Sequence, residues 1–136
     1  MSALHVASAG IHEEGLDQTR VTCVEPCEVV SLDGYRRHGN IWNLSAGGVY
    51  AVLRPPLPPP GRTVLLSFML PEDSRPITCE ARVQWHNPSS GLEGRGSVKL
   101  TLPPGCGLSF RVIDPQDAAR IAARVLSSIR GGAPPR

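Results

Sequence analysis

Long hydrophobic runs are missing from this 136-residue chain. No apolar stretch approaches the roughly 18 residues that a membrane span requires. The N-terminus also lacks a basic segment followed by an apolar one, which a secretory signal would show. We therefore expect a soluble, cytoplasmic protein without membrane insertion. Hydrophobic residues make up 40% and charged residues 19% of the chain, a composition that favours a folded core over global disorder.

Aromatic residues and lysines are scarce. Aromatic side chains account for 4% of the residues, which disfavours a protein that stacks single-stranded nucleic acid along a row of rings. Only one of the 14 cationic residues is a lysine, and the net charge of +2 is too small to predict binding to long nucleic acid. Arginine suits planar, bidentate recognition of phosphate and guanine, although high-GC codon usage gives the same bias.

Patterns typical of metal sites and catalytic centres are also lacking. Three residues separate Cys23 from Cys27 and no second close pair follows, so the four cysteines are expected to be buried small apolar side chains. Without an export signal, disulfides are disfavoured. Ser45 lacks the preceding glycine of a nucleophile elbow, and His38 and His86 have no visible partner. The sequence predicts no enzyme, no metal and no cofactor.

Short strand patterns separated by glycine and proline dominate the rest of the chain. Strands are predicted over 21–32, 35–43, 49–53, 63–70, 77–85 and 107–113, with a further one through Val98, Leu100 and Leu102. Pro26 predicts a break or bulge in the first of them, as in an edge strand. The clean alternation of 77–85 places Trp85 on the buried face with Val83.

A helix with capping signals at both ends is predicted at the end of the chain. Asp114 is the expected N-cap, Pro115 suits the first helical position and Gly131 the C′ position. An apolar stripe follows at steps of three and four: Ala118, Ile121, Ala122, Val125, Leu126 and Ile129. We therefore predict an all-β fold with one helix: a six- to seven-stranded antiparallel barrel closed by a C-terminal helix, with a two-sheet sandwich as the alternative. Residues 1–15 are expected to be a flexible leader, 16–130 the domain and 131–136 a disordered tail.

One glycine-rich loop between two predicted strands carries a motif. Asn43, Ser45 and Gly48 spell Asn-x-Ser-x-x-Gly, and Arg20 stands at the start of the first strand. In these residues the sequence resembles the PilZ domain family, whose small bacterial barrels typically bind cyclic di-GMP through Arg-x-x-x-Arg and Asp/Asn-x-Ser-x-x-Gly motifs. The resemblance covers about residues 16–130, including Gly107-Leu-Ser-Phe110 and the closing helix.

The resemblance implies a ligand site made of five residues. They are Arg20, Asn43, Ser45, Gly47 and Gly48. Cyclic di-GMP is a dianion with two guanines, so a guanidinium can meet phosphate or a guanine edge, and amide and hydroxyl groups can meet the base. Glycines let the backbone approach the ligand closely. Trp42, Tyr50 and Trp85 could stack a guanine, although at least two of them are expected in the core.

One position departs from the family pattern. Leu16 stands where the other motif arginine belongs, and the surrounding leader is acidic. Arg36, Arg37, Arg82 or Arg111 are candidates to compensate. Two functions follow from the resemblance: a cyclic di-GMP receptor or adaptor, or a degenerate module that binds no nucleotide and acts through protein contacts, for example with motility or chemosensory components.

Overall fold

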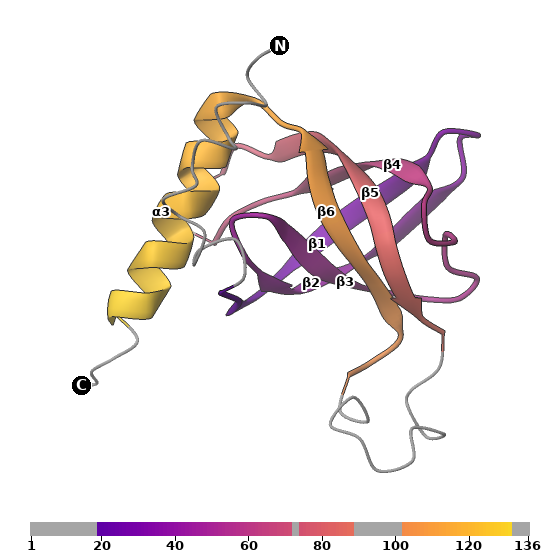
Figure 1. Cartoon of the computed structure of the whole chain (residues 1–136), viewed down its shortest axis with the longest axis horizontal. Coiled ribbons are helices and arrows are strands. Elements are labelled where there is room, and N and C mark those ends of the chain that lie inside the picture. Colours follow the sequence, from indigo (N-terminus) through magenta and orange to yellow (C-terminus); the bar gives the residue numbers. More distant parts are fainter. Residues whose placement is uncertain (1–18, 72–73, 89–101, 132–136) are drawn as a thin grey trace.

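Six antiparallel strands close into a barrel, and one helix follows them (Figure 1). The computed structural model describes residues 19–71, 74–88 and 102–131. The elements are β1 (Val21–Ser31), β2 (Arg36–Leu44), β3 (Gly48–Leu53), β4 (Thr63–Phe68), β5 (Ile77–Asn87), β6 (Gly105–Val112) and α3 (Pro115–Gly131). Around the barrel the order is β1-β2-β3-β6-β5-β4. The predicted barrel is confirmed and the sandwich is excluded.

Two sequence-based strand details are tested by this topology. Val98 and Leu100, which were predicted in a further strand, lie outside the described residues, and Leu102 lies in a bend before β6. The break or bulge predicted at Pro26 lies elsewhere. Strand β1 continues through the proline, and the register shift of β1 against β2 lies between Thr22 and Glu25. Pairing of β1 with β4 begins only after Pro26, so this ring lies on a stretch where β1 has one hydrogen-bonded neighbour.

The geometry of strand β5 explains why Trp85 is not buried in the core. Ile77, Cys79 and Ala81 point inward and are buried, as the alternation predicts. A register shift between Val83 and Trp85 then adds an extra residue opposite β6. Because such a bulge reverses the facing of the residues after it, the side chain of Trp85 is 42% exposed. The prediction that Trp85 shares the buried face was therefore wrong.

Helix α3 packs beside the barrel and contributes two residues to its core (Figure 1). The carboxylate of Asp114 accepts a hydrogen bond of 2.7 Å from the backbone N–H of Gln116, which confirms the predicted N-cap. Ile121 and Val125 are fully buried in the core. Leu126 and Ile129, predicted in the same stripe, are more than a third exposed, although Leu126 directly follows the fully buried Val125. The helix includes Gly131 rather than ending before it.

The barrel interior is apolar and includes all four cysteines. None of Cys23, Cys27, Cys79 and Cys106 is in a disulfide, and each is buried, as predicted for small apolar side chains. Burial raises the pKa of three of these thiols, Cys27, Cys79 and Cys106, to about 12. Within the described ranges, no helix is long and apolar enough to cross a membrane.

Candidate functional site

The candidate site begins with a contact between two residues that the sequence keeps far apart. Arg20 precedes β1, and its Nη1 donates a hydrogen bond of 2.8 Å to Oδ1 of Asn43 near the end of β2. Antiparallel pairing of Thr22 with Asn43 brings the two segments together. The arginine of the predicted site and the first residue of the loop motif are therefore neighbours in space.

The serine of the motif organises the β2–β3 loop. Ser45 is fully buried, and its hydroxyl accepts hydrogen bonds from the backbone N–H groups of Gly47 (3.2 Å) and Gly48 (3.1 Å). The same hydroxyl donates to the carbonyl of Gly48 at 3.3 Å. One donor and two acceptor positions are all that a hydroxyl offers, so this group is fully used within the loop. Ser45 shapes the backbone, and its hydroxyl has no hydrogen-bonding capacity left for a ligand.

Gly48, the glycine of the motif, allows the close packing of β3 on β6. A Cβ atom at Gly48 would collide with the backbone carbonyl oxygen of Leu108. The loop is fixed to β6 by a further hydrogen bond of 2.9 Å from the N–H of Phe110 to the carbonyl of Gly47. A side chain at position 48 would therefore push the two strands apart and move the loop.

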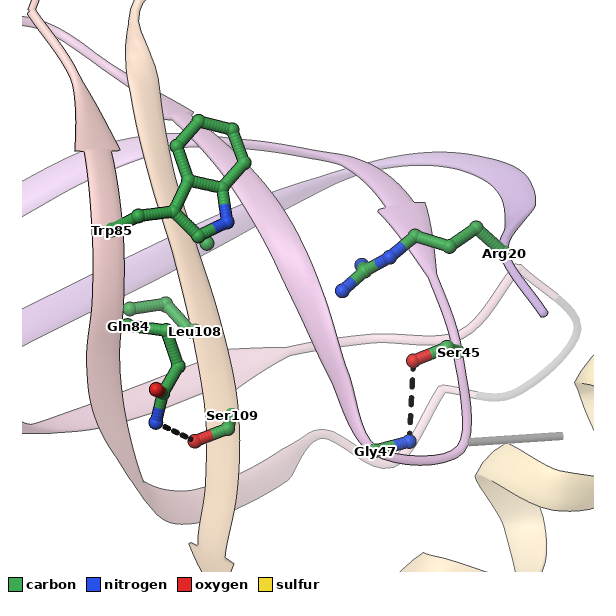
Figure 2. A pocket seen from close by; sticks show the side chains of 8 residues that line it. Arg20, Ser45, Gly47, Gln84, Trp85, Leu108 and Ser109 are labelled. Atoms are coloured by element: carbon green, nitrogen blue, oxygen red, sulfur yellow. Dashed lines mark hydrogen bonds between the residues drawn. The ribbon is translucent and has the colours of Figure 1, made fainter. Parts of the chain in front are cut away.

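A groove of about 350 Å³ lies over this loop on the outer wall of the barrel (Figure 2). Its size falls within the range of small-molecule sites, which run from roughly 300 to 1,000 Å³. Residues from before β1, the β2–β3 loop, β5 and β6 line it: Arg20, Ser45, Gly47, Gln84, Trp85, Gly107, Leu108 and Ser109. Three of the five predicted site residues line the groove: Arg20, Ser45 and Gly47. Asn43 is not in the lining but is hydrogen-bonded to Arg20. Gly48 lies next to the groove, at the start of β3.

Arg20 is the one charged side chain among these lining residues. Partial desolvation lowers its pKa from the ordinary 12.5. A guanidinium nevertheless keeps its proton in proteins, so the groove presents a positive charge at neutral pH. None of Arg36, Arg37, Arg82 and Arg111 lines the groove. Arg36 is paired with Glu28 at 2.6 Å, and Arg37 donates to the carbonyl of Pro56 and the hydroxyl of Ser31.

Sequence reasoning named Trp85 as a stacking candidate but missed the polar residues on the wall that β5 and β6 contribute. Gln84 and Ser109 line the groove and are joined by a hydrogen bond of 2.8 Å from Nε2 to Oγ. In the sequence, polar residues at such strand positions cannot be told from ordinary solvent-exposed residues. Only the pairing of β5 with β6 brings them together on one wall of the groove. Of the three aromatic candidates, Tyr50 is buried, whereas Trp42 and Trp85 are 39% and 42% exposed. The expectation that at least two of them belong to the core was wrong.

Comparison with known proteins agrees with the fold. The PilZ domain model matches residues 17–127. No curated protein sequence matches at a significant level. The solved structure of the Bacillus subtilis inhibitor of motility, MotI/DgrA, is 21% identical with a TM-score of 0.66, and the match covers 85% of this chain and 51% of that one. This chain thus spans about half of the motility inhibitor.

Two further structures are similar. The PilZ domain of YcgR from Escherichia coli, solved with c-di-GMP, is 15% identical with a TM-score of 0.61, and the match covers 84% of this chain and 91% of that one. The PilZ domain of CeSA from a cellulose-synthesizing bacterium is 21% identical with a TM-score of 0.53, at 83% and 99% coverage. At these identities the similarity shows a shared fold.

Proposed function

Because the chain belongs to the PilZ domain family, we propose that it is a cytoplasmic, non-enzymatic receptor for cyclic di-GMP that acts on a protein effector, in the control of motility. The observation that carries this proposal is the Arg20–Asn43 hydrogen bond beside the groove. It joins the two motif segments that the family uses for this ligand.

The chemistry of the groove suits a cyclic dinucleotide. The ligand carries two phosphates, and the Arg20 guanidinium offers planar, charged donors that fit a phosphate or the O6 and N7 edge of guanine. Asn43 can donate and accept toward a base. Gly47 lets the ligand approach the backbone of the loop, because glycine has no side chain. Ser45 contributes by holding that backbone in shape.

The similar structures support the same ligand and output. The YcgR PilZ domain was solved with c-di-GMP, and the Bacillus subtilis protein is an inhibitor of motility. Both facts concern those proteins, and their extension to this chain is part of our proposal.

A single motif arginine predicts modest affinity. Leu16, at the position of the other arginine, lies outside the described residues. Loss of one bidentate arginine contact typically costs about 1–3 kcal/mol, or roughly 5- to 150-fold in affinity. We therefore expect binding in a roughly micromolar range rather than a nanomolar one.

Isothermal titration with cyclic di-GMP tests the proposal. The wild-type chain should bind saturably, and Arg20→Ala should weaken binding by about 10-fold or more. Arg54→Ala, an exposed arginine at the end of β3 that does not line the groove, is the matched control and should bind like wild type. Equal affinity in Arg20→Ala would refute the assigned site. Absence of heat from the wild type at millimolar nucleotide would instead favour the module that acts through protein contacts alone.

A further inference from the structure

We infer that helix α3 has a second apolar face, and that this face binds the same face of a second copy of the chain in an antiparallel helix pair. The inference goes beyond the proposed function and does not depend on it. The second face consists of four residues at helical steps of three and four: Ala119, Ala122, Leu126 and Ile129. It is separate from the stripe that packs on the barrel, in which Ile121 and Val125 are fully buried.

The second face is accessible to solvent. Leu126 and Ile129 are 37% and 44% exposed, Ala119 is exposed and Ala122 is partly buried. Because each residue turns an α-helix by about 100°, the centre of this face lies roughly 100° around the helix from the stripe that packs on the barrel. A helix that packs only on its own barrel needs one apolar stripe, and α3 has two.

The charged residues of α3 lie mainly on the side toward the barrel. Asp117 and Arg120 form an ion pair of 2.7 Å with side chains that are 18% and 15% exposed, and Arg120 also donates to the carbonyl of Arg75. Arg124 is partly buried as well. Among the described residues of α3, Arg130 is the one charged residue at an exposed position. A helix that faces only water normally carries its charges outward, whereas a nearly uncharged outer surface is typical of the centre of an interface.

The residues of the second face differ in size along the helix. The two nearer the N-terminal end are alanines, and the two nearer the C-terminal end are Leu126 and Ile129. In an antiparallel pair that is centred on Arg124, Leu126 of one copy lies opposite Ala122 of the other, and Ile129 lies opposite Ala119. Large side chains then pack against small ones, as in a well-packed core. A parallel pair would place large residues opposite large ones and leave a gap between the alanines.

The charges at the two helix ends favour the same orientation. The first turn of α3 contains Asp117 and follows the N-cap Asp114, and the last turn contains Arg130. In the antiparallel pair the last turn of one helix lies beside the first turn of the other, so that Arg130 approaches the acidic end of the second copy. The opposite partial charges of the two helix dipoles also lie side by side. In a parallel pair, like charges would meet.

The proposed contact predicts a dimer and no larger assembly. Both copies use the same face, so a two-fold axis closes the pair. One pair of helix faces is a small interface compared with the roughly 1,200–2,000 Å² that stable complexes bury. We therefore expect a dissociation constant of roughly 10–100 µM.

Sedimentation velocity of the full chain between about 5 and about 500 µM tests the inference. The wild-type chain should shift from monomer to dimer over this range. Leu126→Glu puts a carboxylate into the interface twice, once from each copy, and should raise the dissociation constant by about 10-fold or more. Ser127→Glu is the matched control, because it adds the same charge at the next exposed position, outside the second face, and should dimerise like wild type. Circular dichroism should show that both variants are folded.

Cysteine cross-linking tests the orientation of the two helices. Ala119→Cys and Ile129→Cys, mixed and mildly oxidised, should give a disulfide between position 119 of one copy and position 129 of the other. Trypsin cleavage after Arg120 and Arg124 puts the two positions on different peptides, so mass spectrometry identifies the linked pair. The wild-type chain, whose four cysteines are buried, should give no cross-link under the same conditions.

Three results would overturn the inference: a wild-type chain that stays monomeric at about 500 µM, a Leu126→Glu variant that dimerises like wild type, or an equal loss of dimer in Ser127→Glu. Disulfides that join only identical positions would overturn the antiparallel arrangement. The titration with cyclic di-GMP decides the proposed function separately, because no residue of α3 lines the groove.

Discussion

Arg20 and Asn43 share a hydrogen bond of 2.8 Å that fixes the guanidinium beside the groove, although 23 residues separate them. An amide oxygen is a neutral acceptor, and a phosphate oxygen is a charged one that binds a guanidinium more strongly. A ligand phosphate can therefore replace Asn43 at Nη1 of Arg20 and free the amide for a base. The bond keeps the arginine in position in the free protein, so that less conformational entropy is lost on binding.

Removal of the Asn43 side chain tests this arrangement. Asn43→Ala should weaken cyclic di-GMP binding by roughly 5- to 20-fold, because the arginine loses its support and the base loses an amide. The bond is exposed, so thermal stability should change little. Calorimetry and a melting curve measure the two effects, with Asn40→Ala, an exposed position on the same strand, as the control. Unchanged affinity would show that Asn43 has no part in the site.

Ser45→Ala should act on stability. The hydroxyl satisfies two backbone N–H groups, of Gly47 in a partly buried and Gly48 in a buried position, and leaving them unpaired costs about 1–3 kcal/mol. Urea unfolding should show this loss, whereas Ser67→Ala, whose hydroxyl contacts Thr78 in an exposed position, should cost less than about 0.5 kcal/mol. Equal stability of the two variants would contradict the role assigned to Ser45.

Gly48→Ala tests the close approach of β3 and β6. The added methyl group meets the backbone carbonyl of Leu108, which no change of side-chain rotamer can relieve. We expect a destabilisation of about 2 kcal/mol or more in urea unfolding, together with weaker ligand binding because the loop moves. A variant as stable as wild type would show that the strands separate at little cost.

Local sequence signals predicted much of the fold because they act within one element. Asp114 caps the helix through a neighbour two residues away, and the alternation of Ile77, Cys79 and Ala81 reflects one strand on one core. Trp85 was misplaced because its bulge is a relation between β5 and β6, which alternation along β5 does not contain. The exposure of Leu126 likewise depends on which side of the helix packs against the barrel, because the adjacent Val125 is fully buried.

The candidate site likewise has a part that the sequence predicted and a part that it could not. The loop residues and Arg20 belong to a motif, and the structure brings them together. Gln84 and Ser109 could not be predicted, because a polar residue on an outer strand face has the same pattern whether or not it lines a groove. Ser45 was expected to offer its hydroxyl to a ligand, but the hydrogen bonds that occupy it depend on the loop's backbone conformation.

The N-cap of α3 can be tested by its contribution to stability. Asp114→Ala removes the acceptor for the N–H of Gln116 and should cost about 1 kcal/mol of unfolding free energy. Gln116→Ala changes an exposed side chain in the same turn, keeps the cap and should cost less than about 0.5 kcal/mol. If both variants unfold like wild type, the first turn of α3 contributes nothing measurable to stability.

The buried thiols predict a loss of stability at alkaline pH. In the folded barrel the pKa of Cys27, Cys79 and Cys106 is about 12, against an ordinary value of 9.0. Between these values the unfolded chain loses protons that the folded one retains, so the unfolding free energy decreases as pH rises from about 9 toward 12. Each thiol contributes a slope of up to about 1.4 kcal/mol per pH unit. Urea unfolding at pH 7, 9 and 10.5 should show a smaller decrease in Cys79→Ala than in wild type; equal decreases would mean that this thiol ionises as readily in the barrel as in the unfolded chain.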